Sequence, residues 1–272
     1  MAFGLLAFRR KRTIFELSTM PGTPAIEFSN VSFTLPNGKK ILQAISFEVH
    51  RGEILILLGR SGSGKTTALK LINGLLELSG GELRVDGRPT ADWDPIELRR
   101  GIGYAIQEVG LLPHYTVARN VALVPTIQNW PKEKVSARVE DLLRLVGLNS
   151  EIASRYPHQL SGGQRQRVGV ARALAADPPI LLMDEPFGAL DPLTRADLQR
   201  EFLSLQKQLG KTVLFVTHDL HEALRLGTRI ALLEDGRLVS LTSKDEFLTS
   251  SEPLVKKYAE AFGTYEPQRE KP

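Results

Sequence analysis

The chain has 272 residues, of which 42% are hydrophobic and 24% charged, as is typical of a globular protein. It contains no cysteine, which excludes disulfides, thiolate metal sites and cysteine nucleophiles. The net charge of +4 permits an anionic partner without requiring one, and no apolar run approaches the length of a membrane span.

Residues 1–24 are interpreted as an N-terminal tail. The tail starts apolar and becomes basic at Arg9, which is the reverse order of a secretory signal. A disordered tail is the first interpretation. Contact with anionic lipid and a start at Met20 are the alternatives.

Several extended segments are expected in the first third of the chain. Residues 26–35 alternate in hydrophobicity and run into a Pro-Asn-Gly turn signal at 36–38, and residues 40–49 offer an antiparallel partner. Residues 53–58 are short and apolar, as in a buried strand, and residues 81–87 form a further extended piece. Together these segments predict a mixed sheet rather than a purely parallel one.

An eight-residue motif, GxxxxGK[ST], follows the buried strand. It consists of Gly59, Arg60, Ser61, Gly62, Ser63, Gly64, Lys65 and Thr66. Its glycines let successive N–H groups curl around phosphate oxygens, Lys65 would reach the β- and γ-phosphates, and the Thr66 hydroxyl would take one Mg²⁺ position. A glycine-rich turn with a surface lysine is the structural alternative. The coincidence of strand, motif and helical period over residues 67–75 favours the phosphate loop.

The middle of the chain is expected to be helical. Residues 102–106 predict a strand that ends at Gln107. Helices are expected over residues 117–124 and 132–146, with turns marked by Pro125, Pro131 and Gly147. This pattern predicts a helical insertion, about residues 108–176, between strands of one α/β core.

The last third returns to alternating strands and helices. Ser161 is a good N-cap for a helix over residues 162–176, and Asp191 with Pro192 opens a helix that runs to Leu209. Strands are expected at 180–184 and 212–217, and a terminal hairpin at 229–241. A capping box at 243–246 opens the last helices, which reach about Phe262, and we expect no added regulatory domain beyond them.

Two carboxylates end the strand at 180–184. Asp184 is the expected hard-oxygen ligand for the Mg²⁺ held near Thr66, and Glu185 is free to act as general base on an attacking water. A solvated pair or a helix cap is the structural alternative, and the preceding apolar strand and the phosphate loop weigh against it.

The order of these motifs resembles that of the ABC-type ATPases. Residues 160–164, Leu-Ser-Gly-Gly-Gln, are similar to the family signature, and they lie between the phosphate loop and the two carboxylates. Gln107 resembles the Q-loop glutamine, residues 189–191 the D-loop, and His218 the switch histidine. The resemblance covers about residues 26–241. A lone histidine after a strand is more often structural, so the motif order carries the functional reading of His218.

The resemblance implies an α/β P-loop NTPase of the ABC-ATPase fold, with a mixed sheet core, an N-terminal antiparallel β subdomain and a helical insertion. It implies an ATPase domain over residues 25–242 and a C-terminal helical tail over 243–272. In this family two chains form a head-to-tail dimer that sandwiches two ATP molecules against the partner's signature. Gln107 would then sense Mg²⁺ and water, and His218 would contact the γ-phosphate.

The expected sites are these. Residues assigned to ATP are Gly59, Arg60, Ser61, Gly62, Ser63, Gly64, Lys65, Thr66, Thr67, Ser161, Gly162, Gly163, Gln164 and Asp191. Residues assigned to Mg²⁺ are Thr66, Gln107 and Asp184, and the catalytic residues are Glu185, His218 and Gln107. Leu35 stands where the family commonly carries the aromatic that stacks on adenine, and Phe33 is the alternative.

Within the family, residues 107–125 and 185–194 are most similar to importer ATPases for osmoprotectants such as glycine betaine, choline and carnitine. The resemblance implies transmembrane permease partners, an indirect link to a substrate-binding protein, and a peripheral position on the cytoplasmic face of the cell membrane. Transport of amino acids, nitrate or taurine, lipid trafficking, and a soluble non-transport ATPase are alternatives. No basic tract interleaved with aromatics is present, so no nucleic-acid partner is expected.

Overall fold

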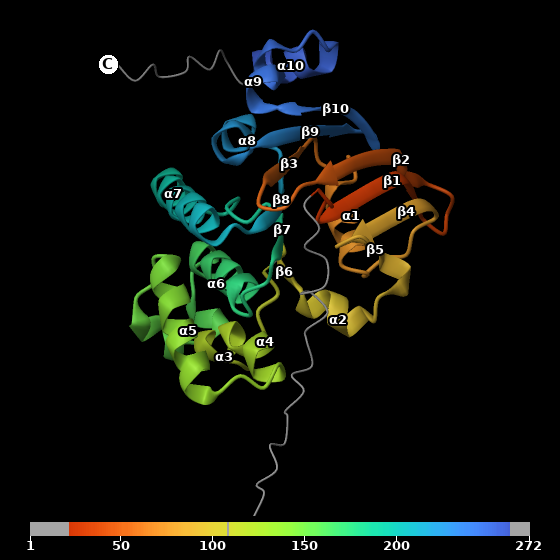
Figure 1. Ribbon diagram of the computed structural model, residues 1–272. Helices are drawn as coiled ribbons and strands as arrows, with labels where there is room; N and C mark the ends of the chain where they lie inside the picture. Colours follow the sequence, from red (N-terminus) through yellow and green to blue (C-terminus); the bar gives the residue numbers. More distant parts are fainter. Residues whose placement is uncertain (1–21, 108, 262–272) are drawn as a thin grey trace, which may run out of the picture.

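The computed structural model describes residues 22–107 and 109–261 (Figure 1). The predicted tail therefore lies almost entirely outside the described residues, as does the predicted helix end at Phe262. Among the described residues, no helix combines the length and apolar character needed to cross a bilayer.

The strands form two sheets. A four-stranded antiparallel sheet has the order β2-β1-β4-β5, and a six-stranded sheet has the order β10-β9-β3-β8-β7-β6. The first contains β1 (Ile26–Thr34), β2 (Lys40–Val49), β4 (Gly80–Val85) and β5 (Arg88–Pro89). The second contains β3 (Ile54–Leu58), β6 (Ile102–Ala105), β7 (Ile180–Asp184), β8 (Thr212–Thr217), β9 (Arg229–Glu234) and β10 (Arg237–Ser243).

The expected mixed sheet core and N-terminal antiparallel β subdomain are confirmed. The six-stranded sheet is mixed, because β10 runs antiparallel to β9 and the other neighbours are parallel. The β1–β2 hairpin and β4, together with β5, form the separate antiparallel sheet. Strand β3 is hydrogen-bonded to β8 on one edge and to β9 on the other, so neither edge is left for the hairpin.

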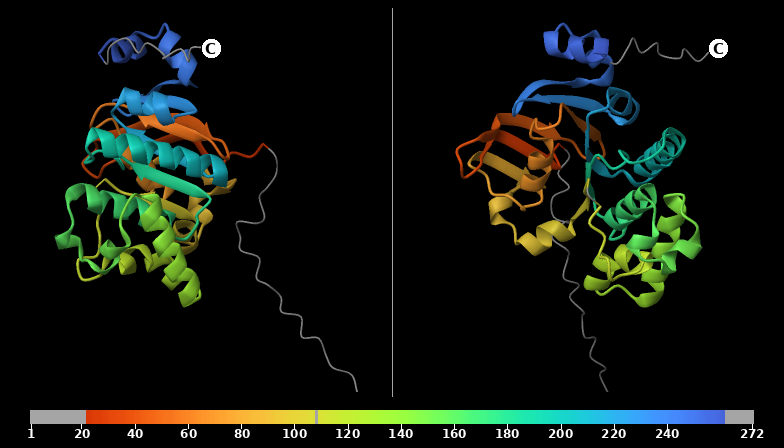
Figure 2. Two further views of the ribbon diagram at one scale, coloured as in Figure 1. Left: turned by 90° about the vertical axis from the view of Figure 1, so that its left-hand side faces the viewer. Right: turned by 180° about the vertical axis from the view of Figure 1, so that it is seen from behind.

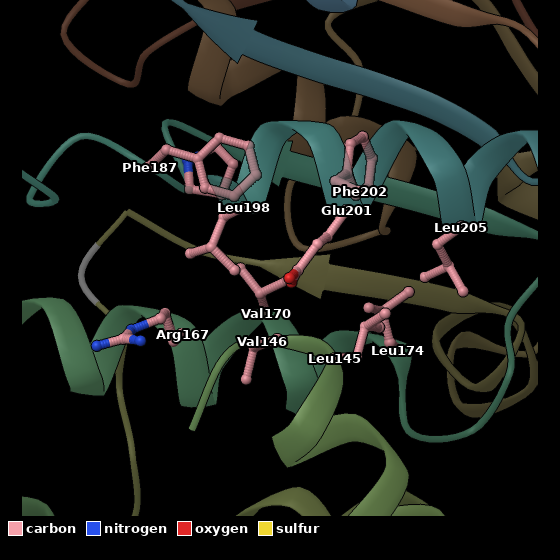
Figure 3. Close-up of a pocket in the computed structure, with 11 residues that line it drawn as sticks. Leu145, Val146, Arg167, Val170, Leu174, Phe187, Leu198, Glu201, Phe202 and Leu205 are labelled. Atoms are coloured by element: carbon pink, nitrogen blue, oxygen red, sulfur yellow. The ribbon is translucent and has the colours of Figure 1, made fainter. Parts of the chain in front are cut away.

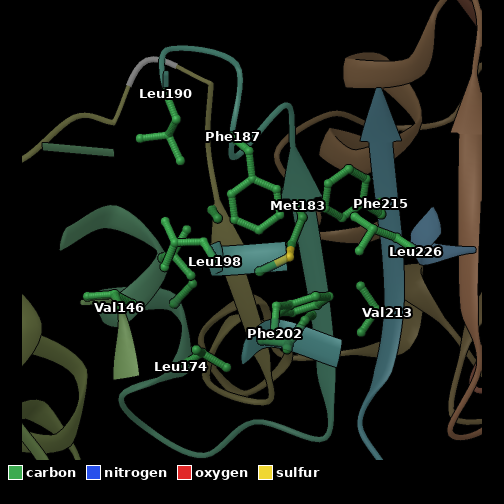
Figure 4. Packing of buried hydrophobic residues seen from close by; sticks show 14 of the residues in the cluster. Val146, Leu174, Met183, Phe187, Leu190, Leu198, Phe202, Val213, Phe215 and Leu226 are labelled. Atoms are coloured by element: carbon green, nitrogen blue, oxygen red, sulfur yellow. The ribbon is translucent and has the colours of Figure 1, made fainter. Parts of the chain in front are cut away.

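Both faces of the six-stranded sheet are covered, which explains its nearly continuous apolar strands. Along β3, Leu55 and Leu57 pack toward the antiparallel sheet. The alternate residues Ile54, Ile56 and Leu58 pack toward the helices on the opposite face. Figure 4 shows part of this second core, where the ring centroids of Phe187 and Phe215 lie 5.7 Å apart. The period-2 alternation of strand side chains thus divides one strand between two cores.

Ten α-helices are found among the described residues. They are α1 (Lys65–Ile72), α2 (Pro95–Arg100), α3 (Val117–Val121), α4 (Leu123–Ile127), α5 (Lys132–Leu145), α6 (Gly162–Leu174), α7 (Pro192–Leu209), α8 (Leu220–Leu226), α9 (Lys244–Thr249) and α10 (Pro253–Ala261). Helices α3 to α6 lie between β6 and β7, where the insertion was expected. In Figure 2 this green region and the blue α9–α10 pair stand at opposite ends of the molecule.

Three predicted helix starts are confirmed by their capping geometry. The Ser161 hydroxyl accepts a hydrogen bond from the Gln164 N–H, and the Gln164 side chain accepts one from the Ser161 N–H. The Asp191 side chain caps α7 by accepting a hydrogen bond from the Thr194 N–H at 3.0 Å. Ser243 and Glu246 form the predicted box at α9.

The structure corrects two expectations about helix ends. Pro125 does not mark a turn, since it lies in the first turn of α4, where a proline needs no intrahelical donor. The break falls instead at Ala122, between α3 and α4. Helix α1 ends at Ile72, so Leu75 is not on its buried face and is 49% exposed. Helices α2 and α8 were not predicted from the sequence.

The parallel arrangement decides where chemistry can occur. Strands β3, β6, β7 and β8 all run the same way, so their carboxyl ends meet at one edge of the sheet. In open α/β sheets, ligands bind beyond this edge. The phosphate loop, Gln107, Glu185 and His218 follow closely after these four strands, whereas the predicted signature residues lie at the start of α6.

Candidate functional site

The loop Gly59–Thr66 lies against the carboxyl edge of the sheet. The backbone at Gly62 and Gly64 has φ values of +84° and +102°, which residues with a Cβ rarely adopt. A Cβ at Gly64 would lie 2.6 Å from Leu42 Cδ2, so the loop also approaches β2 closely. These glycines are therefore required by the curl of the loop itself.

Lys65 turns its side chain back into the loop. Its Nζ donates hydrogen bonds to the carbonyl oxygens of Gly59, at 2.8 Å, and Arg60, at 2.7 Å. The residue is 5% exposed, and burial lowers the pKa of its ammonium, while the carboxylates of Glu185 and Asp184 oppose that shift. The loop carbonyls thus hold a cation at the centre of the loop, where phosphate oxygens would be bound.

Thr66 and Asp184 place two hard oxygens side by side. The Thr66 hydroxyl donates to Asp184 Oδ1 at 3.2 Å. Burial raises the pKa of Asp184, and the Thr66 hydrogen bond partly offsets that shift. Among the described residues no group of three His, Cys, Asp or Glu side chains gathers as a metal site. One carboxylate with a hydroxyl suits Mg²⁺, which takes its remaining ligands from water and substrate phosphates.

Glu185 connects the ends of three strands. Its Oε1 lies 3.0 Å from His218 Nδ1, and its Oε2 accepts a hydrogen bond from Gln107 Nε2 at 3.3 Å. The Glu185 side chain is 19% exposed, whereas that of His218 is 64% exposed. The structure therefore brings all three predicted catalytic side chains together.

The backbone of Glu185 is in the left-handed region, with φ of +46°. Such a conformation in a non-glycine residue persists where the surroundings fix it. The Glu185 N–H donates to the Val216 carbonyl at 3.1 Å, and its own carbonyl accepts from the Gly188 N–H at 3.2 Å. The Glu185 side chain therefore projects from a backbone that is hydrogen-bonded at both its N–H and its carbonyl.

A pocket opens at this edge of the sheet. It is lined by Gly59, Arg60, Ser61, Gln107, Glu185, His218, Lys257, Tyr258 and Ala261. The predicted signature residues, Ser161 to Gln164, are not part of this lining, and neither is Asp191. One chain therefore brings together the phosphate loop, Asp184, Glu185, Gln107 and His218, but leaves its own signature elsewhere.

Gln166 is a connecting residue that the sequence reasoning missed. Its Nε2 donates to the Glu185 carbonyl at 3.0 Å, and its Oε1 accepts from the Ala189 N–H at 2.9 Å. It is 5% exposed and belongs to α6, so it joins the signature helix to the carboxylate strand and to the segment before Asp191. The sequence did contain a signal for this role, because Gln166 is a polar residue four positions before Val170 and so lies on the same apolar helix face.

Replacing this connection predicts a kinetic defect. Gln166→Leu should lower kcat for ATP about tenfold with KM within about twofold, because it removes one of the two hydrogen bonds to the Glu185 carbonyl and the side-chain acceptor of the Ala189 N–H. Steady-state ATPase kinetics measure the split. Gln208→Leu, on the exposed end of α7, is the matched control and should change neither parameter. Equal changes in both variants would contradict a positioning role for Gln166.

The segment after Gln107 is also fixed to α6. Arg172 donates to the carbonyls of Val109, at 2.5 Å, and Gly110, at 2.8 Å. A Cβ at Gly169 would lie 2.5 Å from Val109 Cγ1, so helix and segment are in close contact. Burial lowers the pKa of Arg172. The segment and the signature helix are therefore packed and hydrogen-bonded to each other.

The structure separates the two residues considered for adenine. Phe33 is 9% exposed and packs in the core of the antiparallel sheet, so its ring is not free for a ligand. Leu35 lies just beyond β1 and is partly buried against the same core. The packing of Phe33 disfavours it as the adenine contact, and Leu35 is then the other residue that the sequence offered.

A second, mainly apolar pocket lies between α6 and α7 (Figure 3). Val170, Leu198 and Phe202 are among its lining residues, and Glu201 points into it. Burial raises the pKa of Glu201, and the neighbouring Asp197 adds to the shift. This pocket brings no second reactive group to Glu201 and lies apart from the phosphate loop.

The comparisons with known proteins agree with this geometry. The family model described as ABC transporter matches residues 42–188. The choline transport ATP-binding protein OpuBA of Bacillus subtilis (strain 168) is 50% identical over 223 residues, 82% of this chain and 58% of that protein. The glycine betaine uptake system ATP-binding protein YehX of Escherichia coli (strain K12) is 51% identical over 214 residues, 79% of this chain and 69% of that protein.

A solved structure is also similar. It is the dimeric post-hydrolysis state of the ATP-binding cassette MJ0796 bound to ADP and Pi. The TM-score is 0.76 and the identity 36%, over 80% of this chain and 98% of that one. The chain spans less than two thirds of the length of OpuBA, so activity, substrate and partners do not transfer from that relative directly.

Proposed function

The chain belongs to the ABC transporter family, and from that premise we propose that it is the ATP-hydrolysing subunit of an importer, acting as a homodimer with ATP and Mg²⁺ at two composite sites. The observation that carries the proposal is the grouping of Gln107, Asp184, Glu185 and His218 beside the phosphate loop. The remote signature supports the composite site, because only a second chain can bring it to the pocket.

In this proposal each residue of the pocket has a separate task. The loop N–H groups and Lys65 bind the phosphates of ATP, with the positive end of α1 adding to the field. Thr66 and Asp184 would hold Mg²⁺, with Gln107 as a further proposed ligand; the bound ion would neutralise charge on the phosphate oxygens. The residues present fit this ion, as the Thr66–Asp184 contact of 3.2 Å indicates.

Glu185 is the proposed general base. Its Oε atoms would accept the proton of the attacking water, a transfer worth about 10²–10⁴-fold in rate. His218 and Gln107 contact the two carboxylate oxygens and so orient the group. The partner's Ser161 to Gln164, at the N-terminus of its α6, would bind the nucleotide phosphates from the other side.

The partners and substrate are inferred from the relatives. We assign the chain to the cytoplasmic face of the cell membrane, bound to permease subunits and linked through them to a substrate-binding protein. The cargo class is quaternary-amine osmoprotectants, since the relatives are named for choline and glycine betaine. Arg172 holds the segment after Gln107. In this proposal that segment connects the ATP site to the permease.

Copurification tests this assignment. The tagged chain is purified in mild detergent from its native membranes, and accompanying proteins are identified by mass spectrometry. A polytopic permease with a substrate-binding protein is the expected result, and that binding protein should bind betaine or choline more tightly than amino acids, nitrate or taurine. Recovery in the soluble fraction alone, or with a lipid-trafficking permease, contradicts the importer assignment and leaves the ATPase chemistry standing.

A further inference from the structure

The last described helix, α10, forms part of the pocket described above. Lys257, Tyr258 and Ala261 line it together with the phosphate loop and the Gln107–Glu185–His218 group. Helix α10 follows β10 and α9, and none of the motifs that identified the site lies on it. The ATP-site pocket therefore has a wall that the phosphate, carboxylate and signature motifs do not supply.

Helix α10 is fixed to the core on its other face. Val255 is fully buried and Tyr258 is 7% exposed, and both belong to the same core cluster as Phe247 of α9. Lys257 and Ala261 are four residues apart, so they share one helix face, which differs from the face of Val255. Helix α10 is therefore packed against the core while its other residues line the pocket.

Helix α10 also contacts the phosphate loop. Tyr258 and Arg60 line the same pocket. Burial and the Glu234 carboxylate raise the pKa of the Tyr258 hydroxyl, and the positive charge of Arg60 opposes the shift. Glu234 Oε1 lies 3.9 Å from Arg60 Nε. A Cβ at Gly59 would lie 2.2 Å from the Leu233 carbonyl oxygen, so this end of the loop is in close contact with β9. Helix α10 therefore lies beside Arg60 at the start of the phosphate loop.

The charges of the lining suit a phosphate. Two cations, Arg60 and Lys257, and His218 face the pocket, against the single carboxylate of Glu185, which is already in contact with His218. Lys257 lines the pocket from α10, and Ser61 and the catalytic group are among the other lining residues. The proposed function places the reacting phosphate in this pocket.

We infer that α10 completes the nucleotide pocket and that Lys257 is a further phosphate-binding residue, directed at the terminal phosphate of ATP. The inference rests on the proposed function, since it assumes ATP in this pocket. It assigns to Lys257 a binding role that distinguishes ATP from ADP.

The test compares two adjacent lysines of α10 in the full chain. Lys257→Ala and Lys256→Ala remove the same charge, but Lys256 does not line the pocket. Calorimetry of ATP and ADP with Mg²⁺ should show ATP binding weakened about three- to fivefold by Lys257→Ala at low salt, which is the size of an exposed ion pair. ADP binding should change by less than about twofold, and Lys256→Ala should match the wild type.

Salt and a conservative variant sharpen the result. The loss in Lys257→Ala should shrink at about 0.5 M salt, because screening weakens exposed charge interactions, and Lys257→Arg should restore ATP affinity. If the wild type binds ATP and both alanine variants bind it equally, the inference fails while the proposed function stands. Equal weakening of ATP and ADP would also overturn it. A wild type that binds neither nucleotide would overturn the proposed function itself.

Discussion

Glu185→Gln should bind ATP as the wild type does and hydrolyse it about 10²–10⁴-fold more slowly. The amide has the size of the carboxylate and can still contact Gln107, but it cannot take a proton from water. The backbone at this position is fixed by hydrogen bonds that do not involve the side chain, so the fold should be unaffected. Single-turnover phosphate release and calorimetry measure the two quantities separately.

The control for this substitution is Glu77→Gln, which removes an exposed carboxylate away from the site. It should leave both binding and turnover unchanged. Turnover by Glu185→Gln within about threefold of the wild type would show that Glu185 is not the base. Loss of ATP binding would show that the carboxylate serves the fold or the loop instead.

Lys65→Ala should weaken ATP binding by about 10- to 100-fold, because a charge-assisted hydrogen bond contributes about 1.5–3 kcal/mol. Lys65 is the buried cation of the phosphate loop, and its Nζ contacts only loop atoms in the structure described. Its loss removes the charge placed to meet the β- and γ-phosphates. Isothermal titration with ATP measures the effect directly.

Lys207→Ala provides the control, since Lys207 lies exposed near the end of helix α7 and does not line the pocket. It should leave ATP affinity unchanged, and thermal unfolding should show both variants folded. Lys65→Met, which retains most of the side-chain volume, should weaken binding as much as the alanine variant does. Wild-type affinity in either Lys65 variant would contradict the phosphate-loop assignment.

The sequence was sufficient wherever a local signal decided the structure. The GxxxxGK[ST] motif, the Ser161 cap and the Asp191-Pro192 helix start each depend on residues within one turn of each other. The carboxyl ends of the strands could also be located, because each buried strand is bounded by polar residues. Gln107, Glu185 and His218 were each expected at the end of a strand, and the family resemblance implied that they act together; the structure brings them into contact.

Sequence reasoning was weaker where pairing between distant segments decided the structure. Nothing local indicates that β8 and β9 pair with the two edges of β3, so the strand order of the six-stranded sheet could not be derived from the sequence. The role of Gln166 depends on where Glu185 and Ala189 lie in space. The same holds for α10, whose approach to the phosphate loop follows from the packing of Val255 and Tyr258 in the core.

The composite site is the central claim, and the oligomeric state of Glu185→Gln tests it most directly. Light scattering after gel filtration gives the mass with and without saturating ATP and Mg²⁺. Retained ATP should hold two chains together, so the account predicts twice the 30.1 kDa chain mass with nucleotide and the single-chain mass without it. A mass of one chain at saturating ATP and Mg²⁺ would contradict the account.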